Sequence, residues 1–212
     1  MSMPHGYTLD QSNIQFQAAM LEGVSRTFAL TIPRLPEALR HVVSNAYLLC
    51  RTIDTIEDEP LLSPDKKQDL CNLFLEILDE DKPASLLTDE LGALLSDDTL
   101  PAERELILHL DRVISITRSF HPEQQQALNR CVRIMSEGMI YFQHHARPDG
   151  LNDLTEFNKY CYHVAGVVGE MLTDLFCYYS PEINSNREQM QSLCISFGQG
   201  LQMTNILKDI WD

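Results

Sequence analysis

An acidic cluster in the segment RTIDTIEDE is the feature of this sequence with the clearest chemical potential. Asp54, Glu57 and Asp58 stand at positions i, i+3 and i+4, so on a helix they share one face, about 5–6 Å apart. Tyr47 and Arg51 precede them on the same predicted helix. Like charges at this spacing repel and destabilise the helix unless a cation neutralises them. Taken alone, the cluster fits a metal site and a solvated acidic turn equally well.

A second set of oxygen donors lies in the segment QMTNILKDIWD. Steps of three and four place these residues near one helix face: Gln202, Asn205, Asp209 and Asp212. Asn205 and Asp209 can supply two oxygen ligands together, and Lys208 beside them is a cation suited to a diphosphate. Hard oxygen donors on two helices suit Mg²⁺, which usually shares a phosphate ligand. The two clusters together predict Mg²⁺-assisted ionisation of an allylic diphosphate, with an apolar cavity shielding the carbocation.

Prolines mark the ends of the elements that must position these clusters. Each of the ten can be placed at the end of, or between, stretches with helical periodicity. The predicted helices cover residues 10–30, 36–58, 63–79, 101–118, 122–145, 155–179 and 186–212. Ser63 is a predicted N-cap, and Thr155 with a nearby acid is predicted to begin another helix. The segment 79–100 is predicted to be a polar, exposed loop, and the fold class is all-α, a single-domain helical bundle.

The composition restricts the possible partners and surroundings. Lys and Arg number 16 against 31 Asp and Glu, a formal charge of −15, which argues against nucleic-acid binding. The six cysteines show no CxxC or Cys/His ligand spacing, so we expect reduced thiols rather than disulfides or a zinc site. No apolar run approaches the roughly 18 residues that span a bilayer, and the sequence begins without a secretory pattern. We therefore expect a cytoplasmic protein.

Four segments together resemble the squalene/phytoene synthase family, and most of all its bacterial squalene synthases. SRTFALTIPRLP is similar to the family's N-terminal signature, and YLLCRTIDTIEDE to its first aspartate-rich motif. YCYHVAGVVG resembles the central helix motif, and TNILKDIWD the start of the second aspartate-rich motif. Their order and spacing agree with the family from about residue 25 onward. The resemblance implies an isoprenoid synthase-type helical domain over residues 1–212.

The resemblance also implies a role for each matching residue. The implied magnesium ligands are Asp54, Glu57, Asp58, Asn205 and Asp209. The residues implied to hold diphosphate oxygens are Ser25, Arg26, Arg51 and Lys208. The implied catalytic residues are Tyr160 for proton transfer, Tyr47 near the reaction chamber, Phe28 as an aromatic wall for cations, and Gln202 close to the reacting centre.

Several of these residues could instead have purely structural roles. Arg51 could pair with Glu57 or another local acid, and Tyr47 and Tyr160 could be ordinary core tyrosines. The small residues of the YCYHVAGVVG segment, among them Gly166 and Gly169, could serve close helix packing rather than a prenyl cavity.

Two departures from the family pattern affect the expectations. Lys208 stands where the family commonly has Arg, which keeps the charge but loses the planar fork. The sequence stops at Asp212, where the motif expects a further acid and another helical segment. We therefore expect a C-terminally incomplete domain that lacks helices closing the prenyl cavity and has a weak second metal cluster; the activity of this truncated chain is open.

The leading functional hypothesis is a squalene synthase. This enzyme condenses two farnesyl diphosphates to a cyclopropyl intermediate, presqualene diphosphate, and reduces it with NADPH. Phytoene or dehydrosqualene synthesis, without a reductant, is the alternative within the family. Two further classes are a non-catalytic assembly-factor relative and a class I terpene cyclase. The expected partner is a prenyl diphosphate, with peripheral membrane association through an apolar product; the oligomeric state is open.

Overall fold

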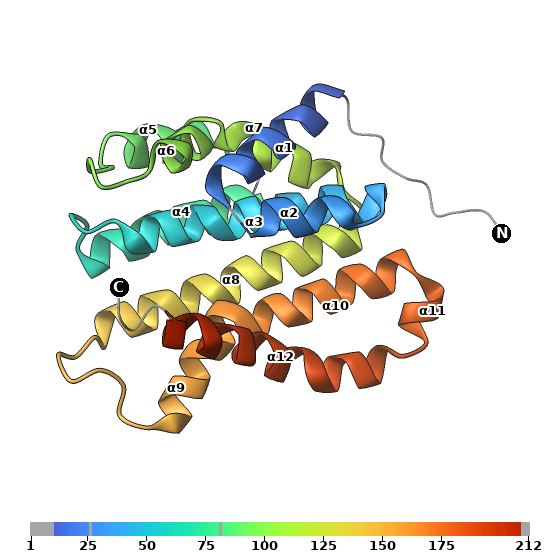
Figure 1. Cartoon of the computed structure of the whole chain (residues 1–212). Coiled ribbons are helices and arrows are strands. Elements are labelled where there is room, and N and C mark those ends of the chain that lie inside the picture. Colours follow the sequence, from blue (N-terminus) through green and yellow to red (C-terminus); the bar gives the residue numbers. More distant parts are fainter. Residues whose placement is uncertain (1–10, 26, 81, 209–212) are drawn as a thin grey trace. The chain divides into compact units, whose positions relative to one another are not determined.

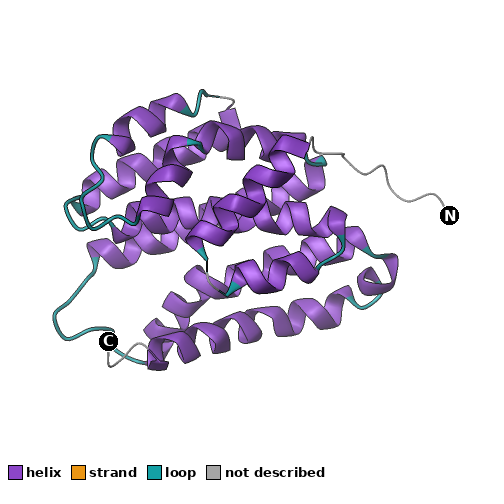
Figure 2. Cartoon of the chain, turned by 45° about the horizontal axis from the view of Figure 1, so that its top comes forward, coloured by secondary structure: helices purple, strands orange, loops and turns teal. Residues whose placement is uncertain are grey.

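The computed structural model describes residues 11–25, 27–80 and 82–208. Every regular element in these ranges is a helix, which confirms the all-α class (Figure 2). The chain divides into two compact units, residues 1–129 and 130–212. The predicted extent of the domain, 1–212, stays a prediction.

The first unit contains most of the helices, which Figure 1 labels along the chain. They are α1 (Gln11–Val24), α2 (Phe28–Thr31), a 3₁₀ turn (Ile32–Arg34), α3 (Glu37–Asp58), α4 (Pro64–Glu80), α5 (Ser85–Gly92), α6 (Pro101–Leu108), α7 (Leu110–Ser119) and the first part of α8 (Pro122–His144). Three of these begin with proline, as expected for a residue that lacks the N–H left unpaired there. Ser63 accepts the backbone N–H of Lys66 at 3.3 Å, which confirms it as an N-cap.

Helix α3 forms the centre of the first unit, packed against α1, α4, α6 and α7. Its apolar positions Leu48, Leu49, Ile53 and Ile56 are fully buried. A polar seam crosses this core at Asn45, which is also fully buried. The Asn45 amide donates to the Thr117 hydroxyl at 2.7 Å and accepts from Gln17 at 3.2 Å. This seam satisfies the buried polar groups and fixes α1 and α7 against α3.

The predicted loop 79–100 is wrong in its middle. It contains α5, and Leu87 and Leu91 on that helix are fully buried. The following turn is fixed by the Glu59 carboxylate, which accepts from the Ser96 N–H at 3.0 Å and the Thr99 hydroxyl at 2.8 Å. Acidic residues on either side of α5 conceal its short apolar face in the sequence.

Two predicted helices also differ in their boundaries. The predicted helix 10–30 ends at Val24, and 101–118 is broken at His109 between α6 and α7. The predicted start at Thr155 is wrong by one residue, and the N-cap is Asp153, whose carboxylate accepts the Glu156 N–H at 2.8 Å.

The second unit contains the rest of α8 and the helices that follow it. These are α9 (Leu154–Cys161), a π-helical turn (Tyr162–Gly166), α10 (Val167–Tyr179), α11 (Pro181–Asn184) and α12 (Arg187–Lys208). Helices α10 and α12 run side by side in opposite directions (Figure 1). Asp174 on α10 links this unit further, since its carboxylate pairs with Arg130 of α8 at 2.8 Å and with Arg187 of α12 at 2.7 Å.

Glycines set the distance between α10 and α12. A Cβ atom on Gly169 would lie 2.4 Å from the carbonyl oxygen of Cys194, and one on Gly198 would lie 2.4 Å from that of Ala165. The backbones therefore meet without intervening side chains. This close approach supports the interpretation that Gly169 serves close helix packing.

Candidate active site

One face of α3 collects four of the residues singled out in the sequence. Tyr47, Arg51, Asp54 and Asp58 stand at i, i+4, i+7 and i+11 within one unbroken helix. Their exposure rises along this face, since the Arg51 and Asp54 side chains are 23% and 28% exposed and that of Asp58 is 62% exposed. The burial of α3 on its other faces leaves this one to carry the polar groups.

The segment between α1 and α2 lies against the start of that face. Tyr47 donates its hydroxyl to the carbonyl oxygen of Val24 at 3.1 Å, and its ring centroid is 5.2 Å from that of Phe28. The Ser25 hydroxyl accepts the backbone N–H of Phe28 at 3.0 Å. Burial raises the pKa of Tyr47 above its ordinary value. The structure thus brings Ser25, Phe28 and Tyr47 together, whereas Arg26 lies outside the described residues.

Arg51 is the cation of this group, and its strongest partner comes from another helix. Its Nη1 is 3.6 Å from Asp54 and its Nη2 is 4.0 Å from Asp58. The same Nη2 donates a hydrogen bond to Glu103, in the first turn of α6. The sequence analysis did not single out Glu103, because a contact across 52 residues leaves no local signal. Its one trace in the sequence is an acid placed just after Pro101, in a first helical turn.

Burial and neighbouring negative charges raise the pKa values of two carboxylates on α3. Burial, opposed by Arg51 and reinforced by the neighbouring acids, raises the pKa of Asp54 to about 7. Burial together with Glu57 raises the pKa of Asp58 to about 6. Both shifts express mainly the cost of burying a charged carboxylate, and the neighbouring negative charges add to it.

The donor set of this face fits Mg²⁺ better than a metal that needs a protein cage. Among the described residues no group of three or more His, Cys, Asp or Glu side chains is arranged to hold a metal ion. Mg²⁺ commonly takes only one or two carboxylates, completing its shell with water and substrate phosphate. Asp54 and Asp58 offer such a pair. In addition, the Nε–H of Arg51 is buried without an acceptor in the described part of the chain, a donor that an anionic ligand would satisfy.

The YCYHVAGVVG segment forms the junction between α9 and α10. Tyr160 is half-buried, and its ring meets that of Phe142 edge-on at 5.2 Å. A π-helical turn begins two residues later, a feature frequent at functional sites. The hydroxyl of Tyr162 donates to Glu170 at 3.3 Å, and burial raises the pKa of Tyr162. Tyr160 and Tyr162 therefore differ in their surroundings: the ring of Tyr160 packs against Phe142, whereas the hydroxyl of Tyr162 is bonded to Glu170.

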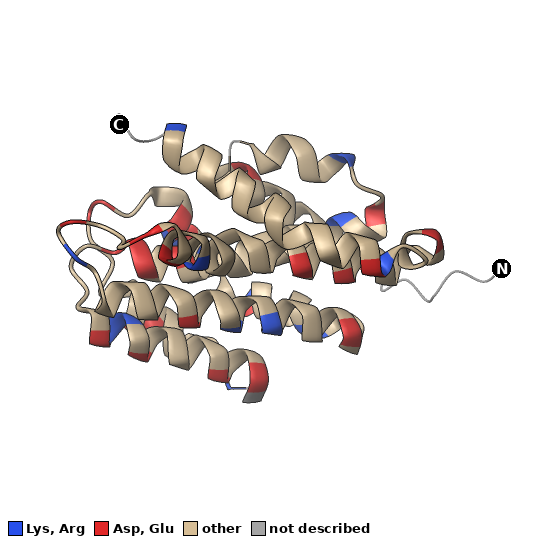
Figure 3. Cartoon of the chain, turned by 90° about the horizontal axis from the view of Figure 1, so that it is seen from below, with Lys and Arg blue, Asp and Glu red and all other residues tan. Residues whose placement is uncertain are grey.

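The predicted second cluster occupies the end of α12. Gln202 is half-buried, while Asn205 and Lys208 are exposed. Asp209, the predicted companion ligand of Asn205, lies outside the described residues. Between Glu188 and Lys208 the helix carries no charged residue (Figure 3). Lys208 is the basic residue in the last turn of α12, where a positive charge interacts favourably with the helix dipole.

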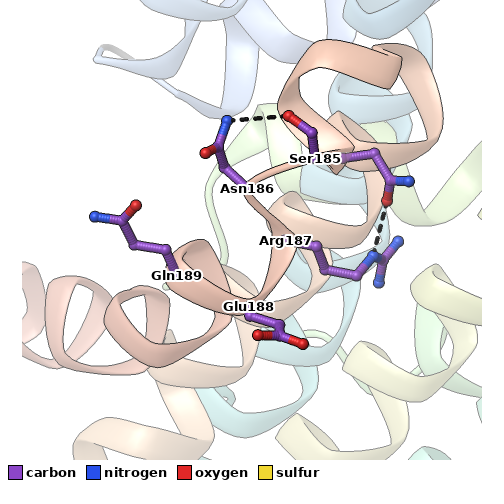
Figure 4. Close-up of a pocket in the computed structure, with 6 residues that line it drawn as sticks. Ser185, Asn186, Arg187, Glu188 and Gln189 are labelled. Atoms are coloured by element: carbon purple, nitrogen blue, oxygen red, sulfur yellow. Dashed lines mark hydrogen bonds between the residues drawn. The ribbon is translucent and has the colours of Figure 1, made fainter.

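One pocket lies at the turn from α11 into α12 (Figure 4). It is lined by residues 184–189, and Arg187 donates to the Asn184 side chain at 3.0 Å there. Asn186 donates to the Ser185 hydroxyl at 3.3 Å. None of the catalytic, diphosphate-binding or metal-binding residues predicted from the sequence lines this pocket.

The described helices and the acidic face of α3 place this protein in the all-α class of the isoprenoid synthase type. Residues 21–212 match the squalene/phytoene synthase family, and the chain belongs to that family. It is 31% identical over 202 residues to the squalene synthase of Schizosaccharomyces pombe, covering 93% of this chain and 41% of that protein. It is also 31% identical to the probable squalene synthase of Neurospora crassa, with 90% and 38% covered.

Solved structures agree with this assignment. The complex of TcSQS with the ligand BPH1237 superposes with a TM-score of 0.75 at 26% identity, covering 94% of this chain and 54% of that one. The chain thus spans about two fifths of the length of the curated relatives it matches. No helix in the described part of the chain is long and apolar enough to cross a membrane.

Proposed function

We propose that this chain carries the diphosphate-ionising part of an enzyme that joins two farnesyl diphosphates head to head. The product of that step is presqualene diphosphate, which NADPH then reduces to squalene. Family membership supports this proposal, as does the name squalene synthase carried by the matched relatives. The observation that carries it is the α3 face, where paired carboxylates, a guanidinium and two aromatic rings lie together.

In this proposal the polar residues manage the charge of the leaving diphosphate. Asp54 and Asp58 would hold Mg²⁺ at one site, with Glu57 as the further ligand that the resemblance implies, and Asn205 with Asp209 at the other. Bound Mg²⁺ would neutralise the diphosphate oxygens as the carbon–oxygen bond breaks. The residues assigned to bind those oxygens are Ser25, Arg26, Arg51 and Lys208. The roles of Arg26 and Asp209 rest on the sequence resemblance alone.

The remaining residues act on the hydrocarbon and the proton. Phe28 and Tyr47 present ring faces that favour a nearby cation, since an aromatic quadrupole attracts positive charge. Tyr160 moves the proton lost when the cyclopropane closes, and Gln202 lies close to the reacting centre. Because the product is a long apolar hydrocarbon, the proposal includes peripheral association of the enzyme with a membrane.

The first test is product formation from labelled farnesyl diphosphate with Mg²⁺, with and without NADPH. Squalene with NADPH and presqualene diphosphate without it is the expected result. Dehydrosqualene without NADPH would instead assign the reductant-free branch of the family. Failure to bind or ionise farnesyl diphosphate would favour a non-catalytic relative and contradict the proposal for this chain.

A second test examines the metal ligands directly. Asp54→Asn should reduce Mg²⁺-dependent binding of inorganic pyrophosphate at least about tenfold, because a ligand oxygen loses its charge. Helicity should remain, since removing a crowded charge relieves repulsion on α3. Asp89→Asn, on the exposed side of α5, is the matched control and should bind as wild type. Equal binding by both variants would remove Asp54 from the ligand set.

A further inference from the structure

The guanidinium of Arg51 is tied more closely to Glu103 than to the carboxylates of its own helix. Its hydrogen bond goes to Glu103, whereas Asp54 and Asp58 lie 3.6 and 4.0 Å away, beyond good hydrogen-bonding distance. A guanidinium normally prefers a close, bidentate pairing with a carboxylate. Here the two α3 carboxylates, which are nearer to Arg51 in the sequence, do not form that close pairing.

Burial explains which carboxylate acts as the anchor. The Glu103 side chain is 8% exposed, Arg51 is 23% exposed and Asp58 is 62% exposed. The hydrogen-bonded end of the Arg51 group therefore lies toward the interior, and the two α3 carboxylates lie on the side that solvent reaches. The first turn of α6 is also a favourable place for a negative charge, because of the helix dipole.

Arg51 and a divalent cation would compete for the same two carboxylates, Asp54 and Asp58. A guanidinium paired directly with Asp54 and Asp58 would oppose a divalent cation there, by occupying their oxygens and by adding positive charge. With its charge partly balanced by Glu103, Arg51 can remain beside the acidic pair without neutralising it.

We propose that Glu103 is a positioning residue that holds Arg51 off Asp54 and Asp58. Both carboxylates then stay available to Mg²⁺, and Arg51 stays beside them to bind diphosphate. This inference rests on the proposed function, since it requires that the α3 face binds Mg²⁺ and a diphosphate. It adds to that function a residue from α6, outside the two acidic motifs.

Calorimetric titration of the chain with Mg²⁺, and with inorganic pyrophosphate in the presence and absence of Mg²⁺, tests this role. Glu103→Gln should weaken Mg²⁺ binding about tenfold, the lower end of the effect of losing an outer partner of a metal ligand. Glu103→Asp keeps the charge and should lose less. Glu90→Gln breaks the exposed pair between Lys66 and Glu90 and is the matched control, expected to titrate as wild type.

The Arg51→Ala background separates positioning from other effects. If Glu103 acts through Arg51, adding Glu103→Gln to Arg51→Ala should change Mg²⁺ affinity less than about twofold, because the partner to be positioned is gone. A purely structural role would instead lower the melting temperature of Glu103→Gln and leave the Mg²⁺ affinity of the folded protein unchanged. That result would overturn the inference, as would an equal loss of affinity in both backgrounds.

The same titrations distinguish this inference from the function beneath it. A wild-type chain that takes up neither Mg²⁺ nor pyrophosphate contradicts the proposed function, and the role of Glu103 falls with it. Wild-type binding that Asp54→Asn weakens and Glu103→Gln does not would leave the function standing and reject the inference alone. Should Glu103→Gln fail to fold, the Glu103→Asp variant and the double variant decide the matter.

Discussion

The ring of Phe28 packs against that of Tyr47, with centroids 5.2 Å apart and planes tilted by 48°. This contact joins the N-terminal SRTF signature to the helix of the first acidic motif. The Tyr47 hydroxyl strengthens the junction through its bond to Val24. Two motifs separated in sequence are thus in direct contact.

Tyr47→Phe should separate the structural from the chemical role of this tyrosine. Loss of the bond to Val24 should lower the free energy of unfolding by about 1 kcal/mol. The ring contact remains, so a double-mutant cycle of Tyr47→Leu with Phe28→Leu should give a separate coupling of about 0.5 kcal/mol, small because Phe28 is half exposed. Urea unfolding followed by circular dichroism measures both. A coupling of zero would show that the rings touch without stabilising the junction.

Tyr160→Phe should abolish proton handling without unfolding the protein. The ring contact with Phe142 is retained by phenylalanine, so the variant should stay folded, with the helicity of wild type by circular dichroism. Formation of presqualene diphosphate should fall at least about a hundredfold, as expected for loss of a general acid–base group, while pyrophosphate binding persists.

Tyr162→Phe is the matched control for that experiment, two residues further on in the same segment. Its hydroxyl bonds Glu170, so this variant should lose some stability and keep most of its turnover. The opposite pattern, with turnover lost only in Tyr162→Phe, would transfer the proton role to Tyr162.

Gly169→Ala should disrupt the packing of α10 on α12. The added Cβ would lie 2.4 Å from a backbone oxygen of α12, which a rotamer change cannot relieve. We expect a loss of about 1–3 kcal/mol in the free energy of unfolding. Gly200→Ala on α12, where an added Cβ would meet no other described part of the chain within 4 Å, should instead gain up to about 1 kcal/mol from helix propensity. Equal effects in the two variants would show that α10 and α12 can move apart at little cost.

Acid should destabilise the first unit through His41. Burial is the main cause that lowers the pKa of His41 below its ordinary value, with Glu37 opposing it. The Gln17 amide nitrogen donates elsewhere, so its oxygen accepts from Nδ1 of a neutral His41 at 3.2 Å.

The sign of the effect follows from this depressed pKa. The unfolded chain binds a proton near pH 6.5 and the folded chain only at lower pH, so stability is complete above about pH 6.5 and falls as the pH drops below it. The raised pKa values of Asp54 and Asp58 act in the opposite direction over the same range, so the contribution of His41 is the difference between wild type and His41→Gln. Between pH 8 and 5 the melting temperature of wild type should fall relative to that of His41→Gln, and the exposed control His145→Gln should follow wild type. A difference that does not change with pH would contradict the role of His41.

Local patterns in the sequence were sufficient for the fold class and for one half of the candidate site. The prolines that open α4, α6 and α8 act through their own missing N–H, so their meaning can be read without any tertiary contact. The i, i+3 and i+7 spacing of Arg51, Asp54 and Asp58 likewise follows from helical geometry alone. Helix α5 was missed because its two buried leucines are too few to give a period against their acidic neighbours.

Only the tertiary structure decided the partners of these residues. Glu103 reaches Arg51 because α6 packs on α3, and the chain between them gives no periodic signal of that contact. Tyr47 meets Phe28 for the same reason, through the turn that follows α1. Side-chain spacing along a helix is fixed by the backbone, whereas burial and charge pairing depend on which helices meet. The sequence therefore determined which groups could do the chemistry, and the packing decided which of them are held in place and by what.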